Sequence, residues 1–223
     1  MVFNKDAASK VAEYLLQVKA IKLQPNDPFT WASGWKSPIY CDNRVTLSYP
    51  KIRTYVRQQM ASAIVETYGK PDVIVGVATG AIALGALVAQ DLGVAFAYVR
   101  SAPKEHGLGN IIEGVVNSGQ SVVVVEDLIS TGKSSLKAVE SLRSAGATVL
   151  GMAAIFTYDF EVANKSFQNE KCDLITLSAY DTLIQQAVKS GYITEAQQDL
   201  IKTWRMDPAN WGKLTSNDIL TNR

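Results

Sequence analysis

The sequence has very few of the residues from which disulfide frameworks and metal sites are built. Its 223 residues include two cysteines, Cys41 and Cys172, and a single histidine. The cysteines are far apart in the chain and do not form the paired ligand spacing of a zinc site. We therefore expect no disulfide framework, no zinc and no dedicated protein metal site. Reduced thiols are the default of a cytoplasmic protein, which is the location we expect.

Net charge and long apolar runs are lacking as well. The chain carries 22 lysines and arginines against 21 aspartates and glutamates, a formal net charge of +1. This balance offers no polybasic surface, so we expect no nucleic-acid partner and no membrane partner. No apolar run reaches the roughly 18 residues of a membrane span, and the first residues lack the apolar core of a signal peptide. A hydrophobic content of 47% is typical of a soluble globular protein.

What is present is one stretch, residues 122–135, that combines a buried strand with a polar turn. Four valines run into Glu126 and Asp127, a turn begins at Ser130, and a helical pattern follows near Lys133. The apolar run is typical of a parallel strand that is buried on both faces, and it predicts a strand that ends at the two acids. A helix start offers free N–H groups to a phosphate. Carboxylates beside it suit the hydroxyls of a sugar.

The end of this turn also invites comparison with a nucleotide-binding P-loop. Gly132, Lys133 and Ser134 match the last three residues of that motif. The motif requires a glycine five positions before its final glycine, and Asp127 stands there instead. The P-loop interpretation therefore fails, and an ordinary capped strand–turn–helix unit stays as the simpler alternative for the turn alone.

Apolar strands alternate with helical patterns along the chain, which predicts an α/β fold with a parallel-rich central sheet flanked by helices. We expect a single domain over residues 1–223, with an N-terminal helix and hood over 1–48, an α/β core over 49–190 and a C-terminal helical tail over 191–223. The strands are expected at 72–77, 94–99, 111–116, 122–127, 148–157 and 174–177. Helices are expected at 5–21, 48–68 and 194–204. Three further helices are expected: one that ends at residue 92, one that begins near residue 133, and one that Asp181 caps.

Three loops should meet at the carboxyl edge of this sheet, where α/β proteins bind ligands. Residues 78–81 form a small-residue turn that suits either an anion or tight packing. Residues 100–110 carry Arg100, Lys104 and His106 beside two glycines, a pattern that favours an exposed functional loop. The third loop is 126–135. Further upstream, residues 29–44 predict a short hairpin, either structural or a small hood over a planar anionic base.

Three motifs resemble those of a known family. The string 122–135 resembles the phosphoribosyl-diphosphate (PRPP) binding motif of type I phosphoribosyltransferases. Ser33-Gly-x-Lys-Ser-Pro38, followed by an aromatic residue, is similar to the N-terminal segment of orotate phosphoribosyltransferases. Arg100-x-x-x-Lys104-x-His106-Gly resembles their catalytic loop. The resemblance implies a type I phosphoribosyltransferase fold and transfer of the 5-phosphoribosyl group from PRPP to orotate, giving orotidine 5′-monophosphate and pyrophosphate in pyrimidine (UMP) biosynthesis.

The resemblance also implies roles for individual residues. Lys104, His106, Glu126 and Asp127 would be catalytic. Ser130, Tyr40 and Arg44 would bind orotate, with Arg44 replacing an arginine that some members carry where this chain has Phe160. The residues implied in PRPP binding are Arg100, Lys104, His106, Glu126, Asp127, Leu128, Ile129, Ser130, Thr131, Gly132, Lys133 and Ser134.

The family further implies Mg²⁺ held mainly through the phosphates, and a homodimer that shares loop 100–110 across its interface. Two alternatives stay open from the sequence. One is a PRPP-dependent phosphoribosyltransferase for a purine base, against which the hood and the loop motif argue. The other is a PRPP-sensing regulator, which would be expected to carry a nucleic-acid-binding surface that the near-neutral charge does not supply.

Overall fold

The structure is a computed structural model that describes residues 2–31, 34–100 and 111–211. Its centre is a six-stranded sheet in the order β10-β9-β8-β5-β6-β7. Neighbouring strands are parallel except for β7, which is antiparallel to β6. The predicted parallel-rich α/β fold is therefore confirmed. The strands are β5 (Val73–Val77), β6 (Ala95–Val99), β7 (Ile112–Glu113), β8 (Ser121–Ile129), β9 (Thr148–Thr157) and β10 (Leu174–Ala179).

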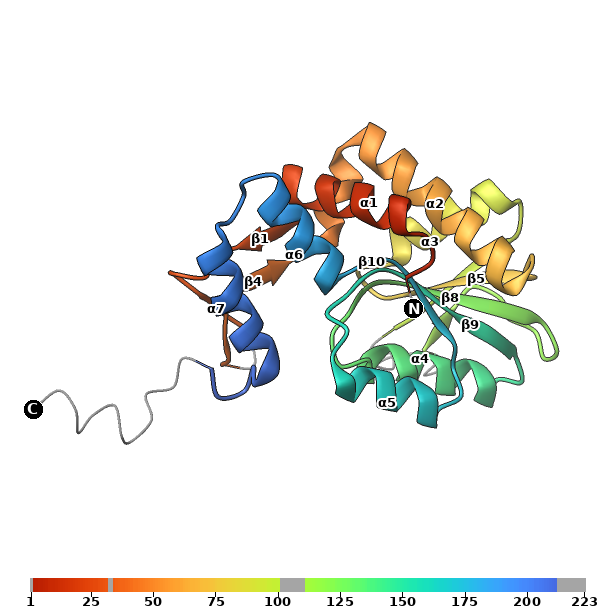
Figure 1. Cartoon of the computed structure of the whole chain (residues 1–223). Coiled ribbons are helices and arrows are strands. Elements are labelled where there is room, and N and C mark those ends of the chain that lie inside the picture. Colours follow the sequence, from red (N-terminus) through yellow and green to blue (C-terminus); the bar gives the residue numbers. More distant parts are fainter. Residues whose placement is uncertain (1, 32–33, 101–110, 212–223) are drawn as a thin grey trace, which may run out of the picture.

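Helices cover both faces of the sheet, as Figure 1 shows. The alternation of side chains along a strand explains the four valines of β8. Val123 and Val125 belong to the core beneath α1, α2 and α3, whereas Val122 and Val124 belong to the core beneath α4 and α5. All four are completely buried, so both faces of this strand need apolar residues. The helices are α1 (Lys5–Gln17), α2 (Pro50–Tyr68), α3 (Ile82–Leu92), α4 (Lys133–Ser144) and α5 (Glu161–Asn169).

A smaller group of elements lies at one side of the sheet, on the left of Figure 1. There β1 pairs with β4, and β2 pairs with β3 as the predicted hairpin. Helices α6 and α7 lie beside β1 and β4, so the described part of the C-terminal tail, up to residue 211, lies against the hood. These elements are β1 (Ile21–Leu23), β2 (Phe29–Thr30), β3 (Lys36–Ser37), β4 (Ile39–Cys41), the 3₁₀ helix η1 (Asn43–Ser48), α6 (Tyr180–Lys189) and α7 (Glu195–Met206).

Several predicted boundaries were wrong for local reasons. The first helix ends at Gln17, because Lys19 takes a left-handed φ of 56° and the chain then pairs with β4 as β1. The second helix begins at Pro50 rather than at residue 48, since Ser48 belongs to η1 and Tyr49 occupies the cap position. Asp181 does not cap α6 either, because it lies in the first turn of that helix.

The C-terminal helix is held by its own cap and by an aromatic cluster. Thr194 and Gln197 form a reciprocal capping box at the start of α7. Trp204 near its end is fully buried against Trp31, Tyr158 and Phe160. Across the described parts of the chain, none of the helices has both the length and the apolar character that crossing a bilayer requires.

Candidate active site

The acidic pair does not end its strand as predicted. β8 continues through Glu126 and Asp127 to Ile129, because the long neighbour β9 extends the ladder past the acids. Leu128 and Ile129 pair with Phe156 and Thr157 of that neighbour. Because successive side chains point to opposite faces of a strand, the two carboxylates leave β8 on different faces. Each carboxylate therefore has its own surroundings.

Glu126 points into the face covered by α4. Only 5% of its surface is exposed. Its carboxylate accepts hydrogen bonds from the Ser135 hydroxyl at 2.8 Å and from the backbone N–H of Asp127 at 3.0 Å. Burial, followed by the negative charge of Asp127, raises the pKa of Glu126 to about 8. The strand thus presents one carboxyl group that retains its proton near neutral pH.

Asp127 lies on the other face, between the hood and the 78–81 turn. The Asn43 side chain donates a hydrogen bond to its backbone carbonyl at 2.6 Å. A Cβ placed on Gly80 would lie 2.3 Å from Asp127 Oδ2, so the turn touches this carboxylate closely. Burial raises the pKa of Asp127 above its usual range. The 78–81 turn therefore packs directly against Asp127.

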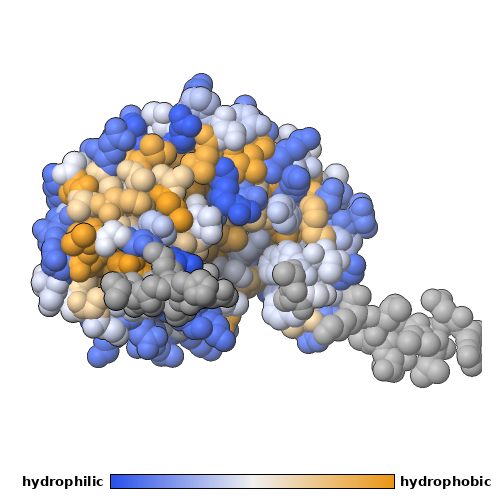
Figure 2. Space-filling model, turned by 180° about the vertical axis from the view of Figure 1, so that it is seen from behind, coloured by the Kyte–Doolittle hydropathy of each residue, from blue (hydrophilic) through white to orange (hydrophobic). Residues whose placement is uncertain are grey.

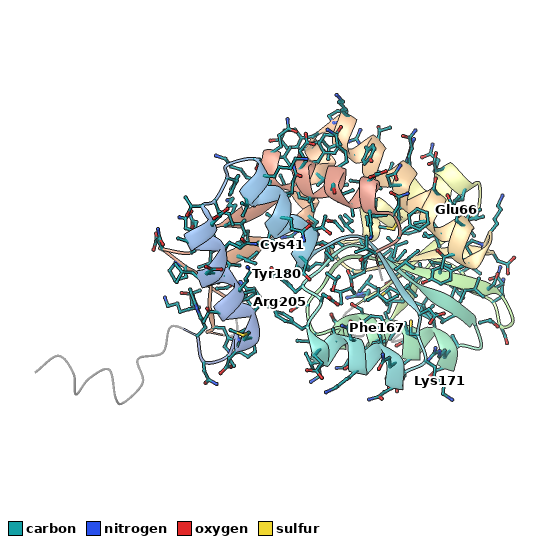
Figure 3. The ribbon with its side chains drawn as sticks, in the orientation of Figure 1. Cys41, Glu66, Phe167, Lys171, Tyr180 and Arg205 are labelled. Atoms are coloured by element: carbon teal, nitrogen blue, oxygen red, sulfur yellow. The ribbon has the colours of Figure 1, made fainter. Side chains whose placement is uncertain are left out.

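The turn after β8 brings the backbone to the start of α4. Gly132 has a left-handed φ of 77°, and a Cβ at this position would lie 2.7 Å from Cε2 of Phe167, which Figure 3 labels on α5. Both the backbone and the space therefore require glycine. No side chain caps the N-terminus of α4, so its first N–H groups stay available to an anion.

Two large cavities meet at this turn, and Thr131 lines both of them. One has a volume of about 540 Å³ and is lined by Ala78, Arg100, Thr131, Lys133 and Ser134, among others. The other, of about 720 Å³, lies between the turn and α7 and includes Ser130, Phe160 and Arg205 in its lining. A molecule with a phosphorylated part and a planar part has room on the two sides of Thr131.

The structure brings most of the predicted site residues together, but not all of them. The side chain of Ile129 is fully buried in the core, so only its backbone is available to a ligand. Arg44 shares a small pocket with Asp127, and its guanidinium is paired with Asp42 at 2.7 Å. Tyr40 is 40% exposed and packs on Phe29. Lys104 and His106 lie outside the described residues.

Sequence reasoning missed several residues that shape the site. Asn43 and Ser135 hold the two acidic residues, and Arg205 reaches the larger cavity from the last turn of α7. A weak signal existed for Ser135, which lies nine positions after Glu126 on the helix that follows the strand. No local pattern indicates Asn43 or Arg205, because their partners are distant in the sequence.

Glu126 makes stability depend on pH in a direction that can be measured. Because its pKa is about 8 in the folded chain and about 4.3 in an unfolded one, the folded chain binds this proton more tightly. Its contribution is complete below about pH 4 and is lost as the pH rises toward about 8. We expect Tm, followed by circular dichroism, to fall between about pH 6 and pH 9, and to fall less in Glu126→Gln. Equal slopes in both proteins would show that Glu126 is ionised throughout.

Comparison with known proteins places this chain in a family. A family model described as the phosphoribosyl transferase domain matches residues 52–179. The orotate phosphoribosyltransferase of Porphyromonas gingivalis is 54% identical over 208 residues, which are 93% of this chain and 99% of that protein. The orotate phosphoribosyltransferase of Listeria innocua is 52% identical over 204 residues, which are 92% of this chain and 98% of that protein.

A solved structure agrees with these relatives. The crystal structure of orotate phosphoribosyltransferase from Aeropyrum pernix superimposes with a TM-score of 0.70 at 27% identity, covering 82% of this chain and 99% of that one. The family match, the relatives that are more than half identical, and the site at the end of β8 agree with the three sequence motifs. The chain therefore belongs to the orotate phosphoribosyltransferases, within the type I phosphoribosyltransferase family.

Proposed function

We propose that this chain transfers the 5-phosphoribosyl group of PRPP to orotate at the turn between β8 and α4. The observation that carries the proposal is the meeting of three features around that turn: the acidic pair on β8, an uncapped helix start and two cavities that share Thr131. The products are orotidine 5′-monophosphate and pyrophosphate, as in pyrimidine biosynthesis.

The turn from Ser130 to Ser134 holds the 5′-phosphate. This assignment is supported by the free N–H groups at the start of α4, by the hydroxyls of Thr131 and Ser134, and by the positive end of the helix dipole. This contact is remote from the reacting carbon. Its binding energy therefore serves to orient the sugar for reaction.

The acidic pair serves the ribose through Asp127. Its carboxylate accepts hydrogen bonds from sugar hydroxyls, and its negative charge beside the ring favours the positive charge that develops as the anomeric C–O bond breaks. Asp127 is the more accessible of the two, since Glu126 is buried and already accepts two hydrogen bonds. We therefore assign the direct contact to Asp127 and the support of the strand end to Glu126.

The departing pyrophosphate is neutralised by cations from the 100–110 segment. Arg100 lines the same cavity as Thr131 and Lys133, which supports this assignment. Its guanidinium also contacts Glu113 of β7 at 3.5 Å. Lys104 and His106 follow Arg100 in the chain, and their catalytic roles stay predictions.

Magnesium fits this site as an ion that arrives with the phosphates. The described residues contain no cluster of three acidic, histidine or cysteine side chains suited to hold a metal ion alone. Mg²⁺ usually keeps several waters and needs one or two carboxylates besides phosphate oxygens, and Asp127 is the carboxylate available here. When bound, the ion would lower the negative charge of the diphosphate.

The acceptor base occupies the larger cavity, beside Ser130. Its walls combine the ring of Phe160 with polar groups, which suits a planar molecule with a charged edge. Tyr40 and Arg44 stay predictions as orotate contacts, because neither lines this cavity.

A homodimer is the assembly we propose. Helix α3 and strand β6 are in contact and carry half-exposed apolar side chains, including Leu87, Phe96 and Tyr98. Figure 2 shows apolar residues gathered over one face of the larger part of the molecule. Association through this face would be tested by light scattering, in which a mass of one chain would contradict it. The cytoplasmic location stays a prediction.

The reaction is tested by following orotate absorbance with PRPP and Mg²⁺. We expect absorbance to fall only when enzyme, PRPP and Mg²⁺ are all present, with one pyrophosphate released for each orotate consumed. Adenine, guanine and hypoxanthine serve as matched acceptors in the same assay, and we expect no turnover with them. Turnover of a purine base in preference to orotate would overturn the proposal, and so would PRPP binding without turnover of any base.

A further inference from the structure

The larger cavity has a wall that comes from a distant part of the chain. One side is the 130–131 turn, and the opposite side is formed by the end of α7 together with the turn after β9. Arg205, in the last turn of α7, lies between these elements. Figure 3 shows it beside Tyr180 of α6, in the space between α7 and the rest of the molecule.

Arg205 connects three elements through its guanidinium. Nη1 donates to Asp181 Oδ1 at 3.1 Å, at the start of α6. Nη2 donates to the backbone carbonyl of Asp159 at 3.0 Å, and it lies 3.4 Å from the Asp159 carboxylate. The guanidinium also lies over the ring of Tyr180, with its carbon 4.5 Å from the ring centroid. Only 26% of the Arg205 side chain is exposed, so water screens these charged hydrogen bonds only in part.

The turn that Arg205 holds has an unusual backbone. Asp159 has a left-handed φ of 54°, a conformation that non-glycine residues adopt only with local support. That support includes the Thr157 hydroxyl, which accepts from the Asp159 N–H at 2.9 Å, and the Asn164 amide, which donates to its carboxylate at 2.9 Å. Of the hydrogen-bond partners named here for Asp159, Arg205 alone comes from outside residues 157–164.

This turn sets the direction of two aromatic rings. Tyr158 and Phe160 flank Asp159, and their rings stack with centroids 5.4 Å apart and planes at 18°. Phe160 also contacts Trp204, the residue before Arg205, at 5.8 Å. Tyr158 is buried, whereas Phe160 lines the cavity opposite Ser130. The position of the Phe160 ring therefore depends on the Asp159 turn.

We infer that Arg205 is a positioning residue for the acceptor base. It fixes the Asp159 turn and the end of α7 against each other, and so holds Phe160 in the wall of the cavity that Ser130 and Thr131 also line. The inference rests on the proposal that the base binds in this cavity. We assign Arg205 a positioning role because both of its terminal nitrogens donate to Asp159 and Asp181, which directs the guanidinium toward these two turns.

The experiment compares Arg205→Ala and Arg205→Lys with a matched arginine elsewhere. Arg143 also ties a helix to a turn, since it donates to the carbonyls of Glu170 and Lys171 at 2.7 and 3.0 Å, and it lines neither large cavity. KM for orotate, KM for PRPP, kcat and Tm are measured for each variant. Ser130→Ala is included as a test of the cavity itself.

We expect Arg205→Ala to raise KM for orotate about tenfold or more while KM for PRPP stays within about twofold, because a displaced wall affects one substrate only. Arg205→Lys should recover part of this loss, since lysine keeps the charge without the two-pronged geometry. Arg143→Ala should lower Tm without changing KM for orotate.

Three results would overturn the inference in distinguishable ways. If Ser130→Ala raises KM for orotate and Arg205→Ala changes only Tm, the base binds here but Arg205 has a purely structural role. If neither variant changes KM for orotate, the base lies elsewhere and the underlying site proposal fails too. Equal increases in both KM values in Arg205→Ala would show general disorder of the site and would also reject a role specific to the base.

Discussion

Replacement of Asp127 by asparagine is expected to lower kcat/KM for PRPP by about a hundredfold or more, the size of effect seen when one group that stabilises developing charge is removed. The substitution keeps the shape of the side chain and removes the negative charge beside the ribose. The Asp127 carboxylate is held in position by β8, by the hydrogen bond from Asn43 to the Asp127 backbone carbonyl, and by the close contact with Gly80. Initial rates with orotate, at varied PRPP and fixed Mg²⁺, measure the effect.

Asp72→Asn provides the matched control. Asp72 also sits at a strand end and accepts hydrogen bonds from Ser121 at 2.7 and 2.8 Å, but it precedes β5 and so lies at the opposite edge of the sheet. Its replacement should leave kcat/KM within about twofold, since no substrate group reaches that edge. An Asp127→Asn protein with normal PRPP kinetics would remove Asp127 from the site.

Gly80→Ala is expected to abolish most of the activity, again by about a hundredfold, because a displacement of about 1 Å in a catalytic group can have that effect. The added methyl would lie 2.3 Å from Oδ2 of Asp127, where no atom fits. Either the 78–81 turn or the carboxylate must move, and both belong to the proposed PRPP site. Because Gly80 does not have a positive φ, the effect comes from space rather than from backbone strain. Activity is measured beside Tm.

Gly93→Ala is the control that separates the effect of the Gly80–Asp127 contact from the general cost of replacing a glycine by alanine. Gly93 ends α3 with a left-handed φ of 61°, and a Cβ there would meet no atom within 4 Å. This variant should lose stability by about 1 kcal/mol and keep its activity. If Gly80→Ala were as active as Gly93→Ala, the close contact between the 78–81 turn and Asp127 would have no role in the reaction.

Much of the fold could be predicted because its signals are local. The valines of β8 indicated a strand buried on both faces, and both cores receive two of them. Glycine at position 132 indicated the sharp turn into α4, and the structure shows both a left-handed backbone and a close ring there. The predictions that failed concerned the residues at which strands and helices begin or end. The length of β8 is set by the ladder with β9, which no pattern around residues 126–129 reveals.

The sequence by itself determined the order of strand, acids, turn and helix, and with it the chemistry that the turn can offer to a phosphorylated sugar. These properties depend on side-chain alternation and on backbone N–H groups, which act within a few residues. Only the tertiary structure decided which distant residues complete the site. Asn43 reaches Asp127 across 84 positions, and Arg205 reaches Asp159 across 46. Such contacts follow from how the hood, the sheet and α7 pack together, and packing is a property of the whole chain.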